Sequence, residues 1–418
     1  MNPNPTPSWI SLCCMVLLLL TPLAQATEAD YHYAGQLVID PDSGHIRADW
    51  QITVYDEAET AIKFVLRDTL GNIVIGGSGV ASGGATREAG YENFWAINVE
   101  LAEPAPFRVI SLSYDGVLMP RPLSNRINAI EAGRIELSVD SFWFPIDVRF
   151  SKEFTADLVV RAGDGWQGVT TGEIRPVQDG LLIHNQDPRM DIVFTLSKSW
   201  HITEGEGFTV YDQRETREGT ERVLASARFC RDFLNQRFGR EDPLPTGSLL
   251  ITDRPSSGYA RENYIVLTDI SNTEPAPLTR FVCHEFAHYW STGAKFDTVD
   301  NWINEAFAEY IGMMAVREQL GDEAFDELRN KMQEQIAGRE LPRVWAEGDT
   351  ERGPYLVQYR KAPLLLAQLE ESIGEETLID WLQLYFANPE KTTTGLLAAL
   401  ETVAGADSRK HFEQMLEE

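Results

Sequence analysis

Between Tyr31 and about Ser199, apolar and polar residues alternate in short runs that are separated by Asp, Gly, Pro and Asn. A period of two places every second side chain on the same face, which is typical of half-buried β-strands. Many short strands at this spacing predict an antiparallel sandwich or saddle-shaped domain. The predicted strands are residues 33–39, 45–54, 61–66, 93–99, 107–114, 134–139, 154–160 and 190–196.

Near residue 200 the pattern changes, and apolar residues begin to recur every three or four positions, as they do in amphipathic helices. We therefore place a domain boundary at about residue 203, between a β domain (27–203) and a mainly helical domain (204–418). The predicted fold class is α+β. The predicted helices are residues 216–238, 277–292, 301–320, 323–336, 358–372, 375–386, 393–403 and 408–417, with short strands at 208–211 and 248–252.

Residues 1–26 have the pattern of an export signal. The apolar run from Ile10 to Leu20 is as long as a signal core and too short to span a bilayer comfortably. Ala24-Gln25-Ala26 supplies a small-x-small cleavage pattern, so we expect a mature chain that starts near Thr27 and is periplasmic or extracellular. Because no Lys or Arg precedes the apolar run, an uncleaved anchor remains an alternative. No later segment is apolar enough to insert stably in a membrane.

The charge balance excludes some classes of partner. The chain has 36 Lys and Arg against 64 Asp and Glu, a formal net charge of −28. This excess repels nucleic acid and anionic membrane surfaces. Signal removal would leave Cys230 and Cys283, which either form one disulfide in an oxidising compartment or stay as buried free thiols. The sequence indicates no oligomeric state.

Candidate chemistry is concentrated in His284-Glu285-Phe286-Ala287-His288. On a helix, residues four apart lie on one face, so His284 and His288 can bind one metal ion. Glu285 then lies beside the metal without binding it, in the place of a general base. Glu305 on the following helix is the candidate third ligand. Two His and one Glu with an open fourth position is the pattern of catalytic zinc.

A core helix that happens to carry two histidines is the alternative interpretation of this motif. Two imidazoles and a carboxylate buried without partners would cost several kcal/mol. A metal ion supplies the missing partner, so the motif favours a Zn²⁺ site.

The second half of the chain resembles the gluzincin zinc metallopeptidases of the aminopeptidase N type. Residues 284–288 and 302–310 are similar to the family pattern H-E-x-x-H followed by W-L-N-E-G-F-A. Residues 259–263 (Tyr-Ala-Arg-Glu-Asn) stand where the family has G-A-M-E-N, and residues 359–362 resemble its Y-x-K-G segment. The resemblance implies a thermolysin-like catalytic domain after an N-terminal saddle domain, without the family's large C-terminal helical superdomain.

The resemblance also implies roles for single residues. His284, His288 and Glu305 would bind zinc, and Glu285 would take a proton from the attacking water. Tyr359 would donate a hydrogen bond to the oxyanion that forms on the substrate.

The resemblance further implies that Glu262 would bind the α-ammonium group of a peptide. It also implies that Asn304 and Glu309 would support the metal ligands. Gly312 stands where many family members place an acid that steadies a ligand. Glu309, one turn after Glu305, either takes over that function or is a solvated surface glutamate. The Tyr259 and Arg261 substitutions leave the preferred substrate side chain open.

The leading functional hypothesis is an exported zinc aminopeptidase that acts on peptides. One alternative is a zinc endopeptidase or oligopeptidase, because the segment around Arg261 departs from the family. A non-catalytic binding protein that retains a metal site is another. The presence of Glu285 argues against the last alternative, since a structural site needs ligands but no base.

Overall fold

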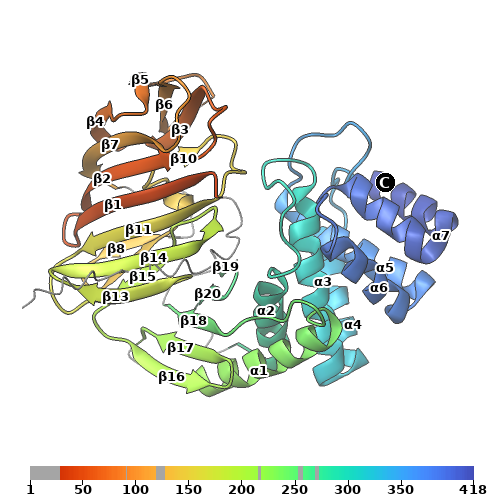
Figure 1. Ribbon diagram of the computed structural model, residues 1–418. Helices are drawn as coiled ribbons and strands as arrows, with labels where there is room; N and C mark the ends of the chain where they lie inside the picture. The colour runs from red at the N-terminus through yellow and green to blue at the C-terminus, as the bar shows by residue number, and fades with distance from the viewer. Residues whose placement is uncertain (1–28, 91, 119–127, 215–217, 253–257, 269–272) are drawn as a thin grey trace, which may run out of the picture.

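The computed structural model describes residues 29–90, 92–118, 128–214, 218–252, 258–268 and 273–418. A β-rich half lies beside a helical half, as Figure 1 shows. The expected export signal lies outside the described residues. The predicted α+β class, with antiparallel sheets first and helices afterwards, is confirmed.

The β-rich half is built around a seven-stranded sheet, in the order β13-β14-β11-β1-β2-β7-β4. Its central strand β1 (Tyr31–Asp40) pairs antiparallel with β2 (His45–Val54) and parallel with β11 (Phe154–Arg161). Every second residue of β2 is buried, as its alternating sequence predicts. The other strands are β4 (Leu70–Gly76), β7 (Arg108–Val117), β13 (Glu173–Val177) and β14 (Gly180–Arg189).

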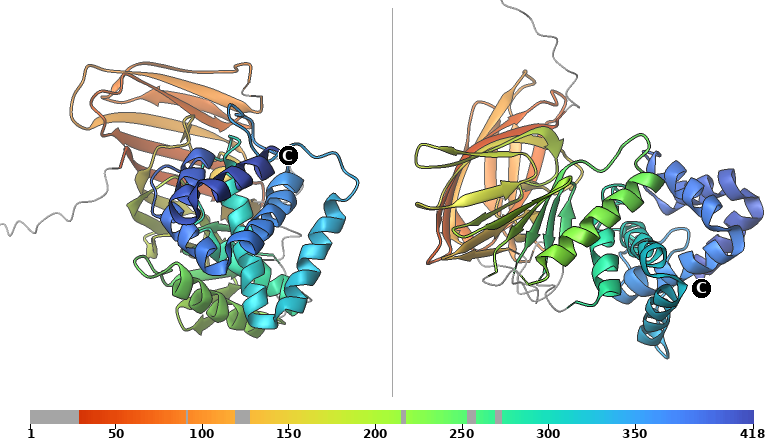
Figure 2. Two further views of the ribbon diagram at one scale, coloured as in Figure 1. Left: turned by 90° about the vertical axis from the view of Figure 1, so that its right-hand side faces the viewer. Right: turned by 90° about the horizontal axis from the view of Figure 1, so that it is seen from below.

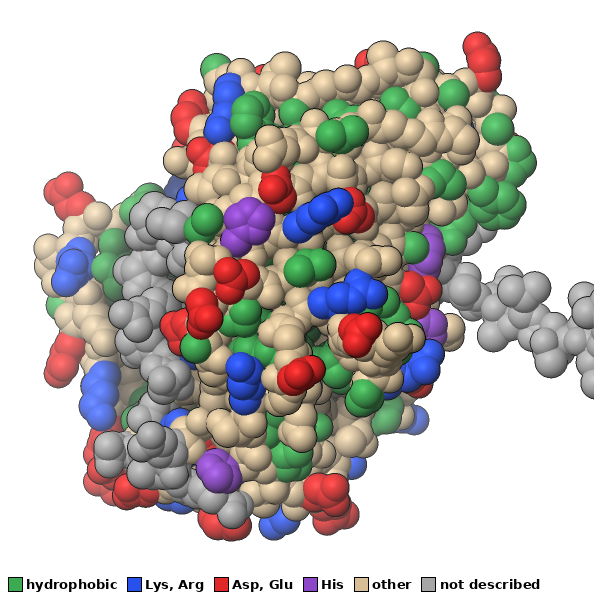
Figure 3. Space-filling view, turned by 90° about the vertical axis from the view of Figure 1, so that its left-hand side faces the viewer, with side chains coloured by type: hydrophobic (Ala, Val, Ile, Leu, Met, Phe, Trp, Pro, Cys, Tyr) green, Lys and Arg blue, Asp and Glu red, His purple; other side chains and the backbone are tan. Residues whose placement is uncertain are grey.

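Two four-stranded sheets complete this half, and a core rich in aromatic side chains, including Trp50, Trp143 and Phe144, fills its interior. Figure 3 shows acidic and basic side chains interspersed on its outer face. One sheet consists of β10 (Ile146–Asp147), β3 (Ala61–Arg67), β6 (Phe94–Leu101) and β5 (Val80–Thr86). The other consists of β12 (Gln167–Thr170), β15 (Phe194–Ser197), β9 (Arg134–Leu137) and β8 (Ala129–Glu131), and a 3-10 turn, η1 (Val139–Ser141), follows β9.

A five-stranded sheet lies between the two halves, where Figure 2 (right) shows it in green. Its order is β16 (His201–Gly205), β17 (Phe208–Asp212), β18 (Gly247–Ile251), β20 (Tyr264–Leu267) and β19 (Tyr259–Arg261), so β19 is an edge strand. One face packs against α1 (Thr220–Arg237) and α2 (Pro275–Ala287). The other face contacts the β12–β15 sheet through Val169, Val193, Leu250, Tyr264 and Val266.

Helix α3 (Asn301–Leu320) is the centre of the helical half and is buried along most of its length. The helices around it are α4 (Asp322–Ile336), a π-helical turn η2 (Val357–Lys361), α5 (Ala362–Ile373), α6 (Glu375–Phe386) and α7 (Thr393–Glu417). Gly405 (φ 85°) bends α7 between the two helices that the sequence predicts. No helix of the described residues is both long and apolar enough for a bilayer span.

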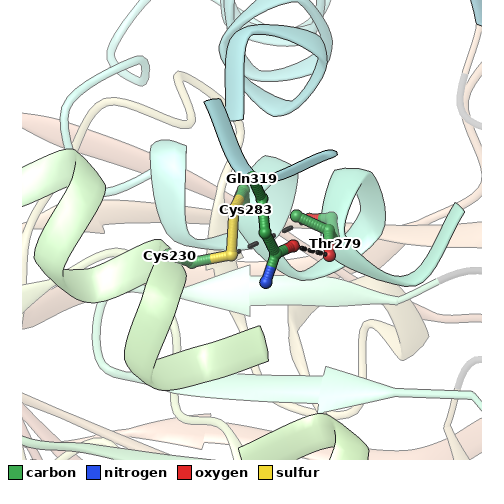
Figure 4. Close-up of a disulfide and its surroundings, with 4 residues drawn as sticks. All are labelled: Cys230, Thr279, Cys283 and Gln319. Carbon is green, nitrogen blue, oxygen red and sulfur yellow. Dashed lines mark hydrogen bonds between the residues drawn. A yellow bond between two sulfur atoms is a disulfide. The ribbon is translucent and has the colours of Figure 1, made fainter. Parts of the chain in front are cut away.

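A disulfide joins α1 to α2 through Cys230 and Cys283, the two cysteines whose state the sequence left open (Figure 4). Their Cα atoms lie 5.1 Å apart. Thr279, one turn earlier on α2, donates a hydrogen bond of 2.5 Å to Gln319 at the end of α3. The disulfide to α1 and the hydrogen bond to α3 therefore hold helix α2 in place immediately before His284.

Candidate active site

Helices α2 and α3 bring His284, His288 and Glu305 together, as the sequence motif predicts. One ligand atom from each residue lies within 4.8 Å of the other two. Oε2 of Glu305 is 3.8 Å from Nε2 of His284 and 3.6 Å from Nε2 of His288, and the two Nε2 atoms are 3.2 Å apart. Two nitrogens and one carboxylate oxygen therefore converge on one point, which is a donor set that suits zinc.

Helix α2 begins at Pro275, and the N–H that proline lacks would have no partner in the first turn of a helix. The helix ends at Ala287, whereas the sequence predicts an end at residue 292. The chain turns after the helix, with backbone bonds from Tyr289 to Phe286 and from Trp290 to Ala287. His288 caps the helix with helical dihedral angles (φ −58°, ψ −19°), so its ring still faces that of His284. The shorter helix leaves the ligand pair unchanged.

Glu309 contacts the outer nitrogen of His284, with 3.1 Å between Oε2 and Nδ1. The residue is 1% exposed, so it is not a solvated surface glutamate. Arg280 donates to both carboxylate oxygens at 2.5 Å, and Arg360 donates to Oε1 at 2.9 Å. Burial alone would raise the pKa of Glu309, but the charge of Arg280 and the contact with His284 outweigh it and lower the pKa to about 2.

The two imidazoles differ in their environment. Burial lowers the pKa of His288 to about 4, which favours the neutral ring that metal ions require. Burial also acts to lower the pKa of His284, but its contact with Glu309 and the charges of Glu285 and Glu305 raise it overall. Because Glu309 faces Nδ1 of His284, Nε2 is the nitrogen directed at the site.

Glu285 is 5% exposed and lies over the five-stranded sheet. A Cβ atom placed on Gly258, just before β19, would lie 2.8 Å from Oε1 of Glu285. The absence of a side chain at Gly258 therefore leaves room for this carboxylate. Burial raises the pKa of Tyr359, and the charges of Glu305 and Glu285 raise it further.

Tyr359 lies in the π-helical turn η2. Burial, the charge of Glu305 and a hydrogen bond with the Glu305 carboxylate raise the pKa of Tyr359 well above its usual value, so the phenol keeps its proton. The Tyr359 ring is nearly parallel to that of His284, with centroids 6.1 Å apart. π-Helical turns are frequent at functional sites.

Glu262 and Asn304 are not part of the ligand cluster. Glu262 lies in the turn between β19 and β20, with a side chain 51% exposed and ion-paired to Arg189 at the end of β14. Asn304 bonds the backbone of Ala294 in both directions, at 2.9 and 3.2 Å. It thereby fixes the loop between the two metal-binding helices.

Arg280 and Arg360 are site residues that the sequence analysis missed. Arg280 precedes His284 by four positions, so helical spacing could have identified it. Arg360 follows Tyr359 directly, and adjacent residues do not share a helix face, so spacing does not identify it. Arg261 had no comparable local signal. Its partners Asp140 and Asp191 (3.0 and 2.8 Å) come from the β-rich half, far away in the sequence.

Comparisons with known proteins give matches among solved structures only. No family model and no curated protein matches the chain at the sequence level. An M1 zinc metallopeptidase variant from Deinococcus radiodurans aligns with a TM-score of 0.71 and 18% identity, over 93% of this chain and 94% of that one.

Two further structures in this group were solved with ligands. A two-domain M1 zinc metallopeptidase variant bound to L-arginine aligns with a TM-score of 0.71, 19% identity and coverage of 93% and 94%. A variant from Deinococcus radiodurans bound to the substrate Tyr-Ser-Ala has a TM-score of 0.67, 17% identity and the same coverage. The chain therefore has the two-domain fold of the M1 zinc metallopeptidases, the aminopeptidase N-like group that its motifs resemble.

Proposed function

We propose that this protein is an exported zinc metallopeptidase that removes N-terminal residues from peptides. The observation that carries the proposal is the convergence of His284, His288 and Glu305 on one point, with Glu285 and Tyr359 beside it. The M1 fold supports the same conclusion.

The three donors fit a zinc ion, because two imidazole nitrogens and a carboxylate oxygen face each other at distances that one cation can bridge. Three protein ligands leave a fourth position open, as in catalytic sites. When bound, zinc supplies Lewis-acid chemistry that makes a water reactive near neutral pH. The contact of Glu309 with Nδ1 would keep the His284 ring oriented for binding.

The residues around the ligands have distinct roles in this proposal. Glu285 takes the proton of the attacking water and delivers it to the leaving amine. The protonated phenol of Tyr359 donates a hydrogen bond to the oxygen of the scissile carbonyl as negative charge develops there. Because this bond strengthens in the transition state, it lowers the barrier to hydrolysis.

Glu262 is proposed to bind the α-ammonium group of the substrate and so to place the cut at the first peptide bond. Its carboxylate is paired with Arg189. A substrate ammonium therefore shares this carboxylate with a guanidinium. The neighbours bound to L-arginine and to Tyr-Ser-Ala support an amino-acid or peptide ligand.

Export is proposed from the pattern of residues 1–26. The disulfide between Cys230 and Cys283 supports it, since disulfides persist in oxidising compartments such as the periplasm or the extracellular space.

The proposal is tested with the purified mature protein on aminoacyl-anilides and on a set of peptides. Each peptide is prepared once with a free and once with an acetylated N-terminus. We expect bound zinc, loss of hydrolysis after chelation and its return with added zinc. Acetylation is expected to abolish cleavage, because it removes the charge that Glu262 binds. Equal cleavage of free and acetylated peptides would favour the endopeptidase or oligopeptidase alternative. Zinc binding without hydrolysis of any peptide would favour a binding protein.

A further inference from the structure

Arg360 makes an unusual number of contacts for a residue outside the ligand set. Its Nη1 donates to Oε1 of Glu309 at 2.9 Å and to the backbone carbonyl of Tyr359 at 2.6 Å. Its Nη2 donates to the hydroxyl of Tyr355 at 3.0 Å, and its Nε donates to the side chain of Gln335. The side chain is 13% exposed, and its bonds to Glu309 and to the Tyr359 carbonyl are partly buried, so water competes little for these two bonds. The bonds to Tyr355 and Gln335 lie at the surface.

The groups that Arg360 binds surround Tyr359. The ring of Tyr355 stacks on that of Tyr359, with centroids 4.6 Å apart and an interplanar angle of 22°. The His284 ring is also nearly parallel to Tyr359, and Glu309 contacts its Nδ1. One guanidinium therefore fixes the backbone of Tyr359, its stacking neighbour and the carboxylate that contacts a metal ligand.

We propose that Arg360 is a positioning residue for the proposed peptidase reaction, which holds the Tyr359 hydroxyl at the metal site. The inference rests on the proposed function, because it assigns Arg360 an effect only through Tyr359. The planar fork of arginine suits this task, since it reaches several acceptors at once in a fixed geometry. A lysine ammonium can pair with Glu309 but cannot span the same set of acceptors.

The first test compares the full-length mature variants Arg360→Gln and Arg360→Lys with the wild type on an aminoacyl-anilide. We expect kcat to fall about 10- to 100-fold in Arg360→Gln, because a misplacement on the order of 1 Å has an effect of this size. KM and zinc content are expected to stay close to wild-type values. Arg360→Lys should keep the folded state and its pairing with Glu309, yet still lose kcat.

Arg329→Gln is the matched control. Arg329 on α4 pairs with Asp326 and with Glu371 on α5, at 2.8 Å each, and contacts neither Glu309 nor Tyr359. It reports the general effect of losing an arginine that forms ion pairs in this domain, and we expect wild-type kcat. Thermal unfolding of all variants shows whether a loss of activity comes from unfolding.

A double-mutant cycle with Tyr359→Phe separates positioning from structural support. If Arg360 acts through the Tyr359 hydroxyl, Arg360→Gln should change kcat by less than about twofold in the Tyr359→Phe background. A full additional loss there would overturn the inference, as would wild-type kcat in Arg360→Gln or in Arg360→Lys. Wild-type kcat in Tyr359→Phe itself would instead overturn the role of Tyr359 in the proposed function.

Discussion

Two residues of α3, Gly312 and Glu309, lie against α2. A Cβ atom on Gly312 would lie 2.6 Å from the Arg280 carbonyl on α2. Glycine therefore permits a close approach of α2 and α3. Glu309, one turn earlier on the same helix, provides the carboxylate that contacts His284. Helical spacing made Glu309 a candidate, but only its burial distinguishes it from a surface residue.

The identity of the proposed base is tested by Glu285→Gln, which keeps the shape of the side chain and removes its proton affinity. We expect kcat to fall by about 10² to 10⁴, because positioned proton transfer has an effect of this size. Zinc content should not change, since Glu285 is outside the ligand cluster. Glu305→Gln is the comparison variant and is expected to lose zinc. Unchanged turnover in Glu285→Gln would rule out this mechanism.

At the level of secondary structure, the sequence predicts elements well where burial is periodic. Helices α3 and α6 begin and end at the predicted residues, and strand β2 does as well. Strand β5 has no comparable signal, because its glycines and mostly exposed positions hide the alternation. The short strands β19 and β20 were not predicted, although the apolar run Tyr264–Leu267 is a strand signal.

The disulfide between α1 and α2 leads to a prediction about stability. Replacing both Cys230 and Cys283 with alanine should lower the free energy of unfolding by about 2 to 4 kcal/mol, because the disulfide closes a long segment of the unfolded chain. Urea unfolding with the zinc content monitored measures the effect. The wild type under reducing conditions serves as the control and should match the double variant. Equal stability of oxidised wild type and variant would contradict this prediction.

On the scale of the whole molecule, the β-rich half contributes directly to the surroundings of the site. Tyr259 donates a hydrogen bond of 3.2 Å to Glu136, and the hydroxyls of Tyr264 and Thr195 lie 2.5 Å apart. Arg261 adds its pairs with Asp140 and Asp191. The sequence predicts both halves and the metal ligands, but not these bonds, because they join residues more than 60 positions apart.

The ion pair of buried Asp191 with Arg261 leads us to expect a specific pH dependence of stability. Burial raises the pKa of Asp191 to about 6, against the opposing charge of Arg261. A carboxyl whose pKa is higher in the folded state stabilises the fold fully below its unfolded pKa of about 3.9, and this contribution is lost as pH rises through about 6. Asp191→Asn removes the titration. We therefore expect the free energy of unfolding of the wild type, measured with urea, to fall relative to that of Asp191→Asn as the pH rises from about 3.9 to about 6. The same pH dependence in both proteins would contradict the raised pKa of Asp191.

The edge position of β19 has a consequence for the shape of any ligand that binds beside it. Among the described residues, this outermost strand keeps one row of amide and carbonyl groups that no neighbouring strand takes up. A polypeptide can join that row only when its own backbone is stretched out, as an additional strand. Compactly folded proteins and helical stretches cannot meet this requirement without unravelling, whereas short flexible peptides and frayed chain ends meet it from the start.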